Sequence, residues 1–209
     1  MKYNEKQVQI IEVAELLFAE HGFGNTSVRQ IADKAGVNLA MISYYFGSKE
    51  KLMHALVDLR TSNVLTTLEN LLKDESLTPL QKMNMVVNEY VQRFVQKQSF
   101  YKIMVREHVL DKNNEITKML LSTKKRNADV LMQIISEGQK KKIFRKNIDV
   151  VMLMNIMVGT VNHALLNKQF YKEYHQLKKM KEEEFNQYLM KKVTEEIKTI
   201  FKALLEHEA

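Results

Sequence analysis

The chain has 209 residues, enough for one large domain or two modest ones with a buried core. It contains no cysteine, which excludes disulfides, thiolate metal sites and thiol catalysis and is compatible with a reducing compartment. The net charge of +7 does not by itself indicate nucleic-acid binding, because residues 113–150 hold nine Lys or Arg against four Asp or Glu, and such a run is typical of a solvated helix face.

The composition predicts an all-α protein. One proline and six glycines leave few helix breakers, and no stretch alternates as a strand does. The N-terminus carries no apolar signal segment, and the longest apolar run, from Val150 to Gly159, is short and is interrupted by Asn155. We therefore expect a cytoplasmic protein without a membrane span.

Two helices are predicted near the N-terminus. The first is expected from about Asn4 to His21, where apolar residues recur with helical spacing until Gly22 interrupts them. A short second helix is expected to begin after Ser27, because Ser27 and Gln30 have the spacing of a capping box.

A helix-turn-helix pattern joins the second helix to a third. Gly36 supplies the turn, and Asn38 is the expected N-cap of a helix that runs for about two turns, to Tyr45 or Phe46. Two short helices cross closely only where the first presents a small residue, and Ala32 meets this requirement.

The rest of the chain is predicted to be helical as well. A fourth helix is expected to begin after Ser48 and to run towards Leu72, and Thr78-Pro79 indicates the start of a fifth, with proline in the first helical position. The remaining segments with helical spacing are residues 100–109, 116–140, 149–167 and 182–205.

The third helix is expected to have one apolar face and one small, mildly polar face. At 100° per residue, Ile42 and Phe46 fall on the inward side, with Met41 and Tyr45 at the boundary. The outward side holds Leu39, Ala40, Ser43 and Tyr44. The second helix of a helix-turn-helix presents such a face to the major groove of DNA.

A helix in the major groove needs phosphate contacts on both flanks. The hydroxyl of Tyr45 and the ammonium of Lys49 would supply contacts on one flank. The N-terminus of the second helix at Ser27, with Arg29 nearby, would supply them on the other. Core packing is the simpler interpretation of an aromatic residue taken alone, and Phe46 is expected in the core, but the order Tyr-Tyr-Phe-Gly-Ser-Lys favours DNA contacts for Tyr45.

Residues Thr26 to Val57, TSVRQIADKAGVNLAMISYYFGSKEKLMHALV, resemble the DNA-binding segment of the TetR/AcrR family of bacterial transcriptional regulators. The end of the first helix, FAEHGF, is similar to the family too. The resemblance implies an all-helical homodimer of about nine helices, with a ligand pocket in the C-terminal domain and release of operator DNA on ligand binding. It also implies that Asn38 to Tyr45 form the recognition helix and that Lys49 is a phosphate-binding lysine.

The expected DNA-binding residues come from the second helix, the third helix and the start of the fourth. These residues are Ser27, Arg29, Gln30, Asn38, Leu39, Ala40, Met41, Ser43, Tyr44, Tyr45 and Lys49. One of them, Leu39, departs from the family pattern. Leu39 stands where many members have Lys or Arg, and a bidentate side chain would contribute ~1–3 kcal/mol of base discrimination. Base preference must therefore rest on Ser43, Tyr44 and apolar contacts from the same face, on Arg29 or Gln30 reaching over, and on DNA shape.

The resemblance also implies a division of the chain by function. We expect a three-helix DNA-binding domain in residues 1–47, a connecting helix in 48–76, and a larger ligand-binding and dimerisation domain in 77–209. Residues 149–167 and 185–205 are apolar enough to pack as a four-helix dimer interface across a two-fold axis.

The expected ligand pocket is a weaker inference, because core packing is the simpler interpretation of each methionine and of His163. The pocket residues are Phe94, Tyr101, Met104, Met119, Asn155, Gly159 and His163.

The leading hypothesis is a homodimeric repressor that a small, largely hydrophobic effector releases from double-stranded operator DNA. The alternative is a DNA-binding adaptor whose helical domain binds a protein partner. We do not expect an enzyme, because the sequence has no glycine-rich phosphate loop and no Ser-His-Asp or paired-carboxylate constellation. Neither a cofactor nor a metal is expected.

Overall fold

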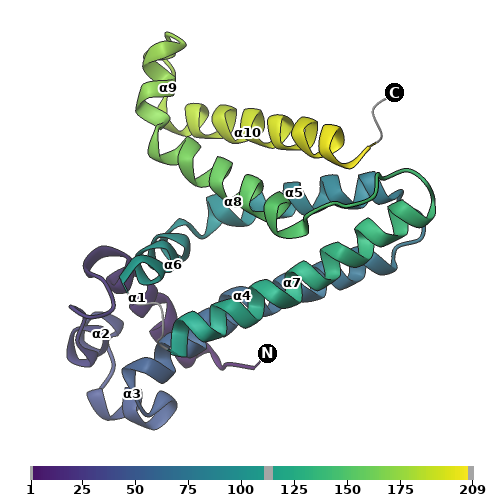
Figure 1. Cartoon of the computed structure of the whole chain (residues 1–209). Helices are drawn as coiled ribbons and strands as arrows, with labels where there is room; N and C mark the ends of the chain where they lie inside the picture. Colours follow the sequence, from purple (N-terminus) through teal and green to yellow (C-terminus); the bar gives the residue numbers. More distant parts are fainter. Residues whose placement is uncertain (1, 111–114, 207–209) are drawn as a thin grey trace. The chain divides into compact units, whose positions relative to one another are not determined.

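The computed structural model describes residues 2–110 and 115–206, and in these residues the chain forms ten α-helices and no strand (Figure 1). The predicted all-α class is confirmed. In chain order the helices are α1 (Glu5–His21), α2 (Val28–Ala35), α3 (Leu39–Phe46), α4 (Lys49–Lys73), α5 (Pro79–Gln96), α6 (Gln98–Leu110), α7 (Glu115–Lys140), α8 (Val150–Leu166), α9 (Lys168–Tyr174) and α10 (Glu182–Leu205).

Several helix ends follow signals that are local in the sequence. The side chains of Asn4 and Ser27 each accept a hydrogen bond from the backbone N–H three residues later, and the glutamine there accepts one from the cap in return. Thr78 and Gln81 form the same reciprocal pair before α5. Gly36 follows α2 in the left-handed conformation, with φ +63°, which glycine adopts without steric cost. The predicted starts of α1, α2 and α5 are confirmed.

The short helix α9 brings the number of described helices to ten, against about nine expected. No glycine or proline separates it from α8. At the junction the backbone N–H of Asn167 donates to the carbonyl of His163 at 3.0 Å, and its side-chain amide lies within 3.1 Å of the His163 ring nitrogens. Taken singly, none of the described helices is long and apolar enough to cross a membrane; α8 and α9 meet that criterion only as a pair bent by 70°.

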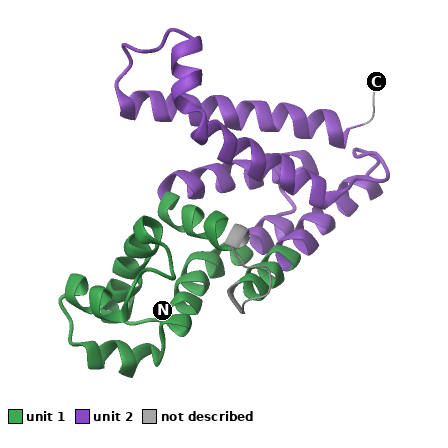
Figure 2. Cartoon of the chain, turned by 60° about the vertical axis from the view of Figure 1, so that its left-hand side comes forward, with its two compact units in different colours: residues 1–66, 97–125 green, residues 67–96, 126–209 purple. Residues whose placement is uncertain are grey.

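The chain forms two compact units (Figure 2). Unit 1 consists of Met1–Thr66 and Lys97–Lys125, and unit 2 consists of Thr67–Gln96 and Arg126–Ala209. These units are defined by packing, whereas the expected limits after residues 47 and 76 divide the chain by function and stay a prediction.

The core of unit 1 is built from buried apolar side chains of α1, α2, α3, α6 and the first turns of α4. One ion pair lies at the edge of this core. Glu15 of α1 is only 4% exposed and accepts two hydrogen bonds from the guanidinium of Arg60 on α4, at 2.8 and 2.6 Å. A buried carboxylate needs such a partner, so the pair fixes α1 against α4.

The core of unit 2 is built around α10, which packs against α5 and α8. Its buried residues recur every three or four positions and are Phe185, Leu189, Met190, Val193, Ile197, Phe201 and Leu205. The turn that follows α7 is fixed to the end of this helix: Phe144 is 1% exposed, and the N–H of Arg145 donates to the carbonyl of Leu205 at 2.8 Å.

Candidate nucleic-acid interface

The outward face of α3 consists of small and uncharged side chains. Tyr44 is 84% exposed and Leu39 is 43% exposed, and Ala40 and Ser43 are exposed as well. None of these four side chains carries a formal charge, so this face can approach base edges without first losing a tightly bound hydration shell.

The opposite face of α3 anchors the helix in unit 1. Ile42 and Phe46 are buried, at 1% and 7% exposure, and Met41 and Tyr45 lie partly buried at the boundary. The ring of Tyr45 packs edge-on against Phe46, with 6.3 Å between centroids, and against Tyr44, with 5.3 Å. The predicted division of α3 into inward and outward faces is confirmed.

The turn between α2 and α3 holds the two helices in a fixed crossing. Ala32 is 2% exposed at the contact, and its carbonyl accepts hydrogen bonds from the N–H groups of Gly36 and Val37. The side chain of Asn38 then caps α3 by accepting from the N–H of Ala40 at 3.0 Å. The small residue, the glycine and the cap are the three features that the sequence pattern predicts here.

The N-terminus of α2 presents polar groups to solvent. Arg29 is exposed, and Ser27 is exposed as the N-cap. The Oε1 of Gln30 accepts from both the N–H and the hydroxyl of Ser27, at 2.8 and 2.9 Å. The side-chain oxygen of Gln30 is therefore used inside the capping box, and its amide NH₂ is the group that remains for a contact with DNA.

Lys49, at the start of α4, makes contacts that sequence reasoning did not anticipate. Its Nζ donates to the carbonyls of Phe23 and Thr26, both at 2.9 Å, and lies 4.5 Å from the centroid of the Phe23 ring. Because an ammonium has three donors, one N–H of Lys49 remains for a phosphate. The lysine fastens α4 to the segment between α1 and α2.

The reversal between α3 and α4 depends on Gly47, whose φ of +78° is unfavourable for other residues. Ser48 follows and caps α4, since its Oγ accepts from the N–H of Lys51 at 3.2 Å. A hydrogen bond from its own backbone N–H, assisted by Ser48, lowers the pKa of Glu50 below its usual range. The carboxylate is therefore ionised between Lys49 and Lys51, and it reduces the positive charge at this helix start.

The residues expected in a ligand pocket are distributed over both units. In unit 1, Tyr101, Met104 and Met119 are partly buried against the core. In unit 2, Phe94 is buried on α5, whereas three residues of α8 are exposed. These three are Asn155, Gly159 and His163.

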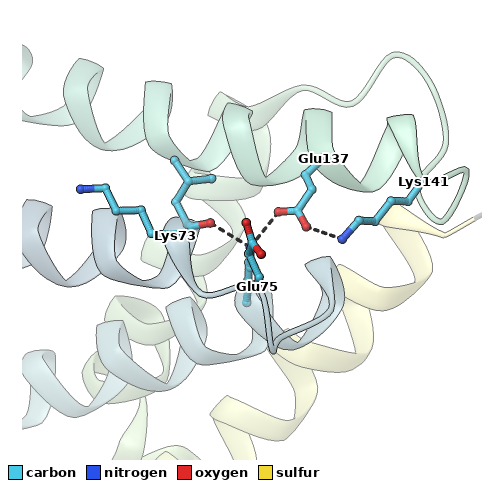
Figure 3. A pocket seen from close by; sticks show the side chains of 6 residues that line it. Lys73, Glu75, Glu137 and Lys141 are labelled. Atoms are coloured by element: carbon cyan, nitrogen blue, oxygen red, sulfur yellow. Dashed lines mark hydrogen bonds and ion pairs between the residues drawn. The ribbon is translucent and has the colours of Figure 1, made fainter.

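The seven residues therefore differ in burial, and their assignment to a ligand pocket stays a prediction. A charged cavity in unit 2, around the ion pair of Lys82 and Glu137 (Figure 3), and a groove along α1 contain none of the seven expected residues. Among the described residues, no group of three or more His, Cys, Asp or Glu could hold a metal ion.

The sequence is similar to known regulatory proteins over most of its length. Residues 10–56 match the profile of bacterial regulatory proteins of the tetR family, and residues 79–195 match that of a tetracyclin repressor-like C-terminal domain. YttP of Bacillus subtilis (strain 168), a probable HTH-type transcriptional regulator, is 33% identical over 144 residues, which are 68% of this chain and 68% of YttP.

Solved structures show the same fold at lower identity. FadR from Bacillus halodurans, a fatty acid degradation regulator, has a TM-score of 0.74 and 21% identity, and the match covers 100% of both chains. SmeT in its complex with triclosan has a TM-score of 0.77 and 16% identity, over 99% of this chain and 94% of SmeT. These likenesses establish the fold.

Proposed function

Since the chain belongs to the TetR family of bacterial regulatory proteins, we propose that it is a homodimeric repressor that leaves its operator when a small hydrophobic effector binds. Membership of the family makes it a transcriptional regulator that binds DNA and not an enzyme. The observation that carries the operator proposal is the exposed, uncharged outward face of α3, flanked by Arg29 and by Lys49.

In this proposal α3 enters the major groove. The hydroxyls of Ser43 and Tyr44 reach base edges, and Leu39 and Ala40 make apolar contacts such as those with thymine methyl groups. Arg29 and the remaining N–H of Lys49 bind phosphates on the two flanks and set the position of the helix. The hydroxyl of Tyr45, the caps Ser27 and Asn38, and the boundary residues Gln30 and Met41 complete the proposed surface.

Dimerisation is supported by the exposed side of α8. This helix has no Asp, Glu, Lys or Arg, and its exposed apolar residues include Val151, Met152, Val158 and Leu166. Apart from the chain neighbours and the backbone of α8 itself, no atom of the described residues lies within 4 Å of the position that a Cβ would take at Gly159, so another helix can approach closely there. An uncharged, exposed helix face of this length favours burial against a second copy, with residues 149–167 and 185–205 forming a four-helix interface.

A hydrophobic effector is supported by two properties of solved relatives. SmeT binds triclosan, and FadR is a regulator of fatty acid degradation. Coupling of ~1–3 kcal/mol between effector and DNA is enough to change operator occupancy 5–150-fold.

The operator proposal is tested by fluorescence anisotropy with DNA fragments from around the gene, including its own promoter. We expect specific binding that weakens with salt, since each phosphate contact contributes about 0.9 to the slope of log K against log salt. Binding equal to that of unrelated DNA for every fragment would contradict the proposal.

The effector proposal is tested on the same complex. Acyl chains and hydrophobic antimicrobials are added at constant salt, and release of the labelled fragment is measured. Thermal stabilisation of the free protein by the same compound is the control, because a compound that binds only to the DNA would not stabilise the protein. Release by a purified protein partner, with no response to any compound, would favour the adaptor.

A further inference from the structure

The loop between α1 and α2, residues 22–26, determines where the N-terminus of α2 lies. Ser27 follows the loop directly and is the N-cap of α2, and Arg29 stands in the first turn of that helix. The proposed function places both residues on the DNA backbone. Because a charge-assisted hydrogen bond to a phosphate is only about 2.7–2.9 Å long, a small displacement of the loop breaks it. The side chains that hold the loop therefore matter for operator binding.

Two side chains of the DNA-binding segment hold this loop. Thr26 is only 1% exposed, and its hydroxyl donates to the carbonyl of Gly22 at 2.8 Å. The ammonium of Lys49 donates to the carbonyls of Phe23 and Thr26. Both side chains belong to residues 10–56, which match the tetR-family profile, and together they fix the end of the loop.

The start of the loop is covered by Arg106 of α6. This helix packs against α1 (Figure 1), and its residues Phe100 and Ile103 lie in the core of unit 1. Arg106 follows Ile103 by about one turn, on the exposed side. Its guanidinium occupies the space of a missing side chain at Gly22: Cζ lies 2.7 Å, and Nε and Nη1 each lie 3.0 Å, from the position that a Cβ would take. The guanidinium is therefore in direct contact with the Gly22 backbone.

Glycine and arginine are both suited to this contact. Gly22 has a φ of +87°, which disfavours other residues, and the lack of a side chain leaves its backbone open to close approach. A planar guanidinium can lie flat against such a backbone, whereas the ammonium of a lysine is a compact charge on a flexible stem. At Gly24, by contrast, no described atom other than those of its chain neighbours lies within 4 Å of the Cβ position.

A surface arginine that only covers exposed backbone is the simpler interpretation. Two observations favour a role in positioning. The hydrogen bonds of Gly22 join it to Phe18 of α1 and to Thr26 of the loop itself, so the guanidinium is the contact that joins it to α6. Since glycine is the residue with the greatest backbone freedom, the start of the loop depends on such neighbours for its conformation.

We propose that Arg106 is a positioning residue for operator binding, because it holds Gly22 against α6 and thereby sets the place of Ser27 and Arg29 on the DNA backbone. This inference rests on the operator binding proposed above. Arg106 acts through the loop and does not contact DNA. It lies outside residues 10–56 and within residues 79–195, which match the C-terminal domain, so operator affinity depends on a side chain beyond the DNA-binding segment.

The first test uses the free protein and needs no DNA. Hydrogen–deuterium exchange of Arg106→Gln should be several-fold faster than that of the parent in peptides that cover residues 22–27, where the N–H groups of Gly22 and Thr26 are hydrogen-bonded. Lys102→Gln is the matched control, since Lys102 is exposed on α6 about one turn earlier, and its exchange should equal that of the parent. Urea midpoints of both variants should stay at the parent value, as is usual for exposed residues. Parent-like exchange in Arg106→Gln would overturn the proposal.

The second test measures operator affinity by fluorescence anisotropy. Arg106→Gln should weaken binding several-fold, and Arg106→Lys should weaken it to a similar extent, because lysine keeps the charge and loses the planar contact. In an Arg29→Gln background the effect of Arg106→Gln should be smaller, since the phosphate contact that Arg106 positions is already absent.

A direct phosphate contact by Arg106 predicts the opposite results. Parent-like affinity of Arg106→Lys, or equal losses in both backgrounds, would overturn the positioning role. Specific binding by the parent that Arg106→Gln leaves unchanged would overturn it as well. Absence of specific binding by the parent would contradict the operator proposal itself, and the two failures are therefore distinguishable.

Discussion

The ammonium groups of Lys49 and Lys82 both donate to main-chain carbonyls, a contact that the sequence predicts for neither lysine. The partners of Lys49 are 26 and 23 residues away in the chain, and Glu137 is 55 residues from Lys82. No local signal relates positions so far apart. The outward face of α3 could be predicted from a rotation of 100° per residue, but the hydrogen-bond partners of Lys49 and of Lys82 could not.

The contacts of Lys49 predict two separate effects of Lys49→Gln. The carbonyls of Phe23 and Thr26 lose a charged donor, so the free energy of unfolding should fall by about 1–3 kcal/mol in urea titrations. The salt slope of operator binding should also decrease by about 1 if the third N–H binds a phosphate. Lys51→Gln, at an exposed neighbour, is the control, and unchanged stability of Lys49→Gln would contradict the structural contact.

Tyr44 is the most exposed of the apolar and aromatic side chains on α3. Tyr44→Ala should weaken operator binding by about 1–3 kcal/mol, measured by anisotropy, because a base contact is lost. Its free energy of unfolding should stay within about 0.5 kcal/mol of the parent, as is usual for surface substitutions. Ile42→Ala, on the buried face, should instead lower stability by about 2–5 kcal/mol. Unaltered DNA affinity of Tyr44→Ala would remove Tyr44 from the proposed surface.

Tyr3 predicts a loss of stability at alkaline pH. Burial, the hydrogen bond to Asp58 at 3.0 Å and the charge of Asp58 raise the pKa of Tyr3 from 10.0 to about 12. The folded state holds this proton more tightly than the unfolded state, so the stabilisation is complete below pH 10 and is lost between pH 10 and 12. The urea midpoints of the parent and Tyr3→Phe should converge across this range, and a constant difference would contradict the assignment.

At the scale of helices, local caps made most boundaries predictable. Ser27, Asn38 and Thr78 each act as the cap that the sequence indicates, because capping depends on residues no more than three positions apart. The expected end of the helix at residue 167 is confirmed, since Asn167 follows the last residue of α8, but α9 was not predicted because Asn167 begins it without a side-chain cap hydrogen bond. Such a junction depends on a side chain folding back onto the previous turn.

The cap of α2 allows stability and DNA binding to be separated. Ser27→Ala should lower the free energy of unfolding by about 0.5–2 kcal/mol, because the N–H of Gln30 loses its acceptor. Ser27→Asp keeps an acceptor at the N-cap and should retain stability, while its charge repels phosphate and weakens operator binding. Urea titration and anisotropy on both variants test this, and equal operator affinities would exclude α2 from the DNA surface.

At the scale of the whole molecule, the helical content and the order of the helices could be predicted from the sequence, whereas the way in which the helices pack together was harder to predict. The placement of α6 and the first part of α7 in unit 1 rests on contacts such as those of Phe100 and Ile103 in its core, which ordinary helical periodicity does not reveal. For the same reason, the exposure of Asn155 and His163 on α8 could not be read from their apolar surroundings in the sequence.

The proposed dimer predicts that a charge on the exposed side of α8 separates the subunits. Val158→Lys places an ammonium on an uncharged helix face, and the dimer should dissociate in sedimentation velocity experiments. Operator affinity should fall at least about tenfold, because two recognition helices about 34–36 Å apart are needed to read successive major grooves. Gln133→Lys, on the exposed side of α7, adds the same charge as a control. A Val158→Lys protein that remains dimeric would contradict the interface.

The outward face of α3 has a consequence for redesign. Because its four side chains carry no formal charge, exchanging them for other neutral ones leaves the attraction between protein and phosphate backbone unaltered. Affinity for the phosphate backbone and preference for a base sequence thus depend on different residues. This chain is therefore a suitable scaffold for a regulator that is directed to a new operator by substitutions on the outward face of α3 alone.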